Sequence, residues 1–129
     1  MNLSMTLAIA LGGALGSVAR WIMSNKITHM VGSSFPWGTL AVNVVGCFLL
    51  GVVAEGMARS WNLSPEVRDF IRVGILGGFT TFSTFSLDAY TLIIEHKQVL
   101  LGLGYALGSV ALGVLALVAG LMTVRMVLP

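Results

Sequence analysis

Hydrophobic residues fill four long stretches of the chain, and polar residues gather in the short segments between them. The stretches run from about residue 3 to 24, 38 to 57, 70 to 94 and 99 to 128. Each is near the ~20 residues that an α-helix needs to cross the hydrocarbon core of a bilayer. The pattern predicts an all-α integral membrane fold, in which residues 1–129 form a single domain of four transmembrane helices.

Short polar segments carry the signals that begin and end these helices. Phe35-Pro36-Trp37-Gly38 places a proline and an interfacial tryptophan at the start of the second stretch, after an expected loop over residues 25–37. Ser64-Pro65-Glu66 predicts an N-cap, a proline at the first helical position and an acidic first turn for the third helix. Residues 95–98 are expected to form a tight turn.

Composition excludes several classes of protein. Hydrophobic residues make up 57% of the chain and charged residues only 9%, against roughly 25% charged in an average soluble domain. Seven basic and five acidic side chains cannot cover the surface of a soluble domain of this size. The single cysteine, Cys47, excludes an intrachain disulfide, and the scattered basic residues give no nucleic-acid footprint.

Basic residues give almost no preference for one orientation in the membrane. Three are expected on one side and four on the other: Arg20, Lys26 and Lys97 against Arg59, Arg68, Arg72 and Arg125. Under the positive-inside rule such a chain inserts both ways, which permits an antiparallel homodimer in the cell (inner or plasma) membrane. The alternative is one topology set by another cue.

Glycine pairs inside the apolar stretches favour close helix packing. Gly12 and Gly16 form one G-x-x-x-G pair, and Gly104 and Gly108 form another. In lipid, such small residues let helix backbones approach closely. Because four helices enclose little more than their own side chains, a pathway through the membrane is expected between two copies.

The run from Gly77 to Ser86 is the densest polar cluster in an apolar stretch. Two glycines precede five hydroxyl residues, Ser83 among them, which weakens a helix by entropy and by side-chain competition for backbone groups. The third helix is therefore expected to break in mid-membrane, and discontinuous helices of this kind build ion sites. The alternative is a continuous helix whose hydroxyls bond to their own turn.

Other residues in the apolar stretches also offer donors. Phe82 and Phe85 lie three apart, and their ring edges carry partial positive charge that can face an anion. Asn43, with Thr39 one turn before it, offers amide donors without a charge. Packing and an interhelical hydrogen bond are the respective alternatives.

The last stretch places Tyr105 and Ser109 four residues apart, with Gly113 next on the same helical face. Their hydroxyls form either a donor ladder or a pair of structural hydrogen bonds. Asp88 lies inside the third stretch, and Arg20 lies near the end of the first, where it can extend to the interface or pair with a partner. No catalytic triad, acidic metal cluster or phosphate loop supports an enzymatic activity.

Three motifs in order resemble the Fluc (CrcB) family of small fluoride channels. They are residues 12–21, residues 38–46 and the specific run from Gly77 to Phe85. The resemblance covers the whole chain, including its length and number of spans. It implies antiparallel, dual-topology homodimers with two fluoride pores along the subunit interface, and passive export of cytoplasmic fluoride.

The resemblance also assigns roles to individual residues. It implies a structural sodium ion at the dimer interface, held by the backbone carbonyls of Gly77 and Thr80. The residues that it implies for the fluoride path are Asn43, Phe82, Ser83, Phe85, Tyr105 and Ser109, supported by Thr39, Arg20 and Asp88. The chain departs from the family at Gly113, where a third hydroxyl is common, and at Asp88, where glutamate is common.

Two other functions fit a four-span chain. A proton-coupled exporter like the small multidrug resistance transporters needs a glutamate in its first helix, yet residues 3–23 contain no acid. Asp88 is the remaining candidate for that role. A passive subunit of a larger membrane complex explains the glycines but gives the hydroxyl-rich run no purpose.

Overall fold

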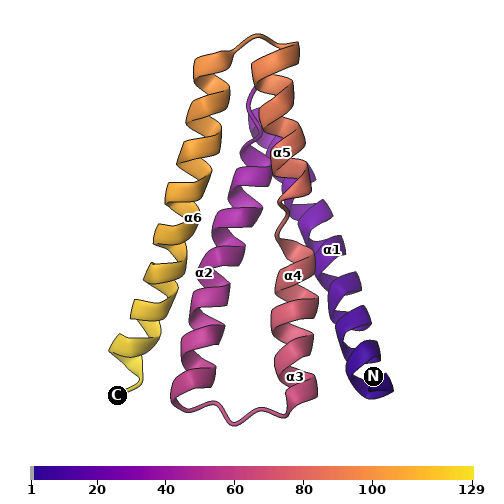
Figure 1. The fold of residues 1–129 in the computed structure, drawn as a ribbon, viewed down its shortest axis with the longest axis vertical. Coiled ribbons are helices and arrows are strands. Elements are labelled where there is room, and N and C mark those ends of the chain that lie inside the picture. The colour runs from indigo at the N-terminus through magenta and orange to yellow at the C-terminus, as the bar shows by residue number, and fades with distance from the viewer. Residues whose placement is uncertain (1) are drawn as a thin grey trace.

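The computed structural model describes residues 2–129. Within that range, four helical spans are long and apolar enough to cross a membrane: Leu3–Val31, Trp37–Arg59, Pro65–Glu95 and Val99–Val127. The same range contains no strand, which confirms the all-α prediction. The spans alternate in direction, lie close together at one end and splay apart toward the end that carries both termini (Figure 1).

Helix α1 (Leu3–Val31) is longer than the hydrophobic pattern suggests. Residues 25–31 were expected in a loop, and that prediction is wrong. No glycine or proline interrupts the segment, so the helix continues until Gly32, whose positive φ of 89° ends it. A helix of 29 residues is about 44 Å long, so its polar last turns extend beyond a hydrocarbon core of about 30 Å.

Glycines set the closest approaches between helices. At Gly16 an added Cβ would lie 2.1 Å from the Ile75 carbonyl oxygen, and at Gly12 2.4 Å from that of Phe70. The expected close packing at the first glycine pair is therefore confirmed. At Gly104 and Gly108 an added Cβ meets nothing within 4 Å, so this second pair mediates no close packing among residues 2–129.

Helices α2 (Trp37–Arg59) and α6 (Val99–Val127) pack along much of their length. The contact depends on glycines of both helices. An added Cβ at Gly51 would lie 2.1 Å from the Leu117 carbonyl oxygen, and one at Gly120 2.2 Å from the Phe48 carbonyl oxygen. These two helices therefore pack backbone against backbone, whereas the first half of the third span packs mainly against α1.

The third span is composed of several helical pieces. Ser64 caps it by accepting a hydrogen bond from Val67 N at 3.3 Å, with Pro65 in the first turn, as predicted. Helical geometry stops after Phe79, and Thr80 is extended, with φ −84° and ψ 159°. The pieces are α3 (Pro65–Asp69), the π-helix η1 (Phe70–Leu76), α4 (Gly77–Phe79), α5 (Ser83–Tyr90) and the π-helix η2 (Thr91–Glu95).

Candidate functional site

Asn43 of α2 bonds to the backbone in the interruption between α4 and α5. Its Nδ2 donates to the Thr81 carbonyl oxygen at 2.9 Å, and its Oδ1 accepts from Thr81 N at 2.8 Å. A continuous helix would direct the Thr81 N–H to the carbonyl of Gly77. The amide therefore takes the place of helical partners for Thr81 and frees the Gly77 carbonyl. Asn43 keeps one N–H for another acceptor.

Hydroxyl groups also bond to the backbone around this interruption. Thr80 Oγ1 donates to the Leu76 carbonyl at 3.0 Å, and Ser86 Oγ donates to that of Phe82 at 2.9 Å. Thr81 Oγ1 accepts from Thr84 N at 3.1 Å and lies 3.4 Å from Ser83 Oγ. Bonding of hydroxyls to their own turn, the alternative to a break, therefore coexists with non-helical backbone.

Arg20 reaches the same interruption from α1. Its Nη1 donates to the Thr80 carbonyl oxygen at 3.3 Å. Arg20 was expected near the end of the first apolar stretch, and α1 continues for 11 residues beyond it, to Val31. The guanidinium thus brings a positive charge beside the non-helical backbone.

An open, largely apolar pocket of about 380 Å³ lies beside the interruption. Several residues singled out from the sequence line it, namely Asn43, Phe82, Phe85, Ser109 and Gly113, together with Cys47, which was not. The Phe82 ring is 78% exposed and its centroid lies 5.6 Å from that of Phe85. The pocket therefore combines an amide, a hydroxyl, a thiol and two aromatic rings.

Tyr105 lies between this pocket and a second, polar one. Its ring is only 2% exposed and its centroid is 5.2 Å from that of Phe85. Its hydroxyl donates to Asp88 Oδ2 at 3.2 Å. Asp88 and Thr39 line the second pocket, of about 220 Å³, together with several further hydroxyl residues and His96. Of the residues predicted from sequence, Tyr105 and Ser83 line neither pocket, and Arg20 lines a third one together with Thr39.

Ser109 differs from Tyr105 in having no hydrogen-bond partner. Its Oγ is buried, with less than 1 Å² exposed, and has no partner among the residues that the structure describes. Such an atom needs an explanation in a native structure. Of the two hydroxyls expected to donate along α6, that of Tyr105 is bonded to Asp88, whereas that of Ser109 has no partner within residues 2–129.

Cys47 and Thr81 were not singled out from the sequence. Cys47 follows Asn43 by four residues on the same helix, a spacing that places both side chains on one face. From this spacing, Cys47 could have been predicted to lie beside Asn43 at the site. Thr81 stands inside the hydroxyl run, but the bonds of its backbone to a distant asparagine have no local signature.

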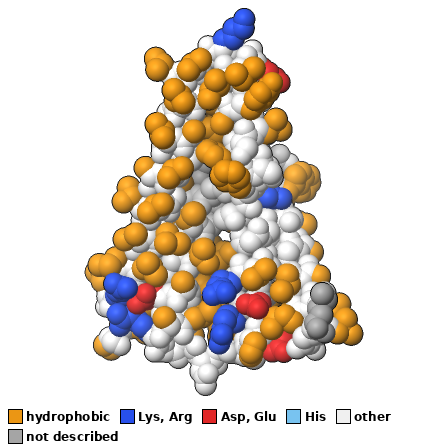
Figure 2. Space-filling view, viewed as in Figure 1, with side chains coloured by type: hydrophobic (Ala, Val, Ile, Leu, Met, Phe, Trp, Pro, Cys, Tyr) orange, Lys and Arg blue, Asp and Glu red, His pale blue; other side chains and the backbone are white. Residues whose placement is uncertain are grey.

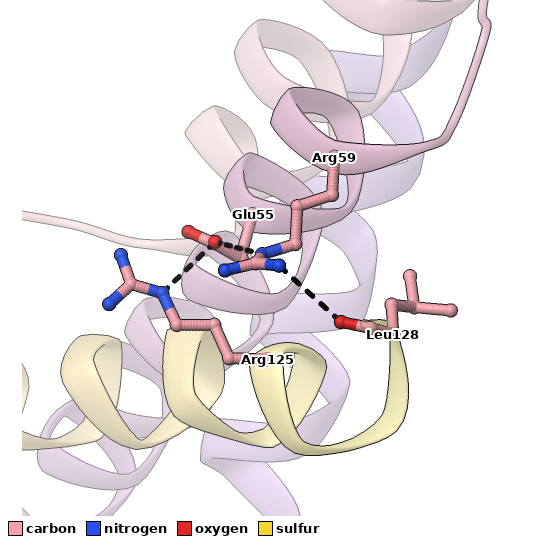
Figure 3. Close-up of polar contacts among 4 residues, drawn as sticks. All are labelled: Glu55, Arg59, Arg125 and Leu128. Atoms are coloured by element: carbon pink, nitrogen blue, oxygen red, sulfur yellow. Dashed lines mark hydrogen bonds and ion pairs between the residues drawn. The ribbon is translucent and has the colours of Figure 1, made fainter.

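A charged cluster joins the ends of α2 and α6 (Figure 3), and none of its residues lines either pocket. Glu55 Oε1 accepts from Arg59 Nε at 2.6 Å and from Arg125 Nε at 3.0 Å. Arg59 Nη1 also approaches the Leu128 carbonyl oxygen, at 3.5 Å. Figure 2 shows charged side chains gathered at this end of the molecule and apolar side chains along its flanks. The pairing of Glu55 with Arg59 suits their spacing of four on a helix.

Metal-ligating side chains do not cluster. Over residues 2–129, no three His, Cys, Asp or Glu residues lie close enough to hold an ion.

Comparison with known proteins places the chain in a family. The model of the CrcB-like protein, Camphor Resistance (CrcB) family matches residues 7–121. A protein of Rhizobium meliloti (strain 1021) named fluoride-specific ion channel FluC is 50% identical over 119 residues, or 92% of this chain and 94% of that protein. One of Nitrobacter hamburgensis, named fluoride-specific ion channel FluC 1, is 48% identical over 125 residues, or 97% of this chain and 98% of that protein. With four apolar helices and these similarities over nearly its whole length, the chain is a multi-pass membrane protein that belongs to the CrcB-like family.

Proposed function

We propose that this protein is a fluoride-selective passive ion channel, and not an enzyme, that lowers cytoplasmic fluoride by letting it leave the cell. Membership of the CrcB-like family and relatives named fluoride-specific ion channels support this proposal. Fluoride enters cells as the neutral acid and is trapped when it ionises. A passive pore in the cell membrane therefore suffices for export.

The pocket beside the interruption is the observation that carries the proposal. Its lining residues include Asn43, Phe82, Phe85 and Ser109 and no charged side chain. A pore must replace the water around a small, strongly hydrated anion without binding it too tightly to release it. The free N–H of Asn43, the Ser109 hydroxyl and the positive ring edges of the phenylalanines are weak, neutral donors of that kind.

A second copy of the chain completes this path. Phe82, Ser83 and Thr84 are exposed on one chain, next to the non-helical backbone of Thr80 and Thr81. Irregular backbone at membrane depth is tolerated only where protein buries it or where it lines a water-filled cavity. A partner packed over this face would cover it and enclose one pore on each side of the interface. With Arg20 beside the interruption, two basic residues stand against four, a small bias that still permits an antiparallel arrangement of the two copies.

Backbone carbonyls at the interruption fit the sodium ion that the family resemblance implies. The Gly77 carbonyl is freed from its helical partner because Thr81 N bonds to Asn43. The Thr80 carbonyl accepts one bond, from Arg20, and keeps a second lone pair. Held by these carbonyls and their counterparts in the second copy, a sodium ion supplies fixed positive charge beside the anion path. Arg20 adds a permanent positive charge at the same level.

Fluoride efflux from liposomes that contain Phe82→Ile or Phe85→Ile tests the proposed path. We expect either change to abolish fluoride flux while the protein still elutes as a dimer. Phe48→Ile is the matched control, since Phe48 lies on α2 and does not line the pocket. Normal flux in both Phe82→Ile and Phe85→Ile would remove the rings from the mechanism.

A further inference from the structure

One face of α6 carries Tyr105, Ser109 and Gly113. The first two positions have a side-chain hydrogen-bond donor and the third has none. The Tyr105 hydroxyl is engaged with Asp88, and the buried Ser109 Oγ has no partner within residues 2–129. One helical turn further, Gly113 is buried and offers no side chain. On α6 alone, donors toward the pocket therefore end at Ser109.

A group from the neighbouring helix occupies the space in front of Gly113. A Cβ added at Gly113 would lie 3.5 Å from Cys47 Sγ, and within residues 2–129 no atom outside the adjacent part of α6 itself comes closer. Cys47 and Gly113 line the same pocket as Ser109, Asn43 and Phe82. The thiol thus stands at the position on the pocket wall to which a side chain at 113 would extend.

We infer that Cys47 is a further permeation-determining residue, whose S–H donates to the anion at the level where Gly113 provides no donor. The inference rests on the proposed channel function and adds a residue to its path. Two features support it: the thiol occupies the space in front of Gly113, and Ser109, whose buried Oγ has no partner within residues 2–129, lines the same pocket. An anion that passes Ser109 would next meet the thiol. An S–H group is a weak hydrogen-bond donor, so it can contact a passing anion without holding it tightly.

Chemical modification tests whether the thiol faces the path. Cys47 is the only cysteine, so methyl methanethiosulfonate can modify no other thiol. The Cys47 sulfur attacks the methylthio sulfur of the reagent and forms a mixed disulfide with it. The bond between that sulfur and the sulfonyl sulfur breaks, so methanesulfinate leaves, and the thiol proton passes to water. Intact mass reports labelling, and gel filtration reports whether the dimer persists.

The modified protein in liposomes is expected to lose at least most of its fluoride efflux while remaining a dimer. Cys47→Ala is expected to be insensitive to the reagent. Complete labelling with unchanged flux, no labelling at all, or loss of flux only through dissociation of the dimer would each overturn the inference. Untreated wild-type protein separates the two proposals, because absence of fluoride flux there counts against the channel function itself.

Substitutions test whether the thiol acts as a donor. We expect Cys47→Ala to slow fluoride efflux roughly two- to fivefold, the effect of one weak hydrogen bond, and Cys47→Ser to restore it. Gly113→Ser fits the structure, because a Cβ there makes only ordinary contact with Sγ. Added to Cys47→Ala, it is expected to recover flux by returning a donor to the same space. Wild-type flux in Cys47→Ala, or no recovery in the double variant, would overturn the donor role.

Discussion

Replacing Asn43 by leucine tests how the interruption in the third span is held. Leucine has nearly the same size but forms neither of the two bonds, at 2.9 and 2.8 Å, between the amide and Thr81. Thr81 is buried, with 9% exposed, so its N–H and C=O lose their partners without gaining water. Each bond contributes about 1 kcal/mol and each unpaired buried group costs about 1–3 kcal/mol. With two such groups, we therefore expect Asn43→Leu to lower the free energy of unfolding by about 2–6 kcal/mol.

Denaturant titration in detergent micelles measures this loss, with the fluorescence of Trp21, Trp37 and Trp61 as the signal. Thr123→Val is the matched control, because the Thr123 hydroxyl bonds only to the Ala119 carbonyl of its own helix, at 2.7 Å, and is exposed. The control is expected to change the free energy of unfolding by less than about 0.5 kcal/mol. If Asn43→Leu destabilises no more than Thr123→Val, the amide does not hold the interruption.

Three further predictions concern packing, charge and topology. Gly16→Ala is expected to lower the free energy of unfolding by about 1–3 kcal/mol, because the added Cβ would clash with the Ile75 carbonyl. Gly13→Ala is the control, because an added Cβ there meets open space, and it should be neutral or slightly stabilising in the same denaturant titration. Glu55→Gln should lower the thermal midpoint more than Arg125→Gln does, because Glu55 is the acceptor that two guanidinium groups share; equal shifts would show that the shared contact is not used. In a Cys47→Ser background, a cysteine added at the C-terminus should react with an impermeant reagent from both sides of the membrane, and labelling from one side alone would exclude dual topology.

Hydrophobic patterning predicts most of the fold because each span is a local property of the sequence. The cap at Ser64 and the turn at residues 95–98 follow from short-range chemistry in the same way. The end of α1 does not follow from hydropathy, because residues 25–31 are polar enough for a loop but contain no residue that stops a helix before Gly32. Hydropathy indicates where a chain meets lipid, and backbone chemistry decides where its helix ends.

The site is predictable only in part because its key contacts join distant residues. The run after Gly77 indicates weakened helix, yet it does not reveal that Asn43, 38 residues before Thr81, takes over the backbone bonds there. Arg20 approaches Thr80 only because glycines let α1 pack closely against the third span. The role inferred for Cys47 depends on its contact with the space in front of Gly113, which lies on another helix. Such contacts depend on helix register, which residue type alone does not determine.

Anion efflux from liposomes containing the purified wild-type protein tests the central claim most directly. Fluoride and chloride electrodes read the two anions in parallel, with no proton or sodium gradient across the membrane. The account predicts fast fluoride release with negligible chloride release. No fluoride release from a well-folded dimer, or release that begins only when a proton gradient is imposed, would contradict a passive channel and would make Asp88 the residue to mutate next.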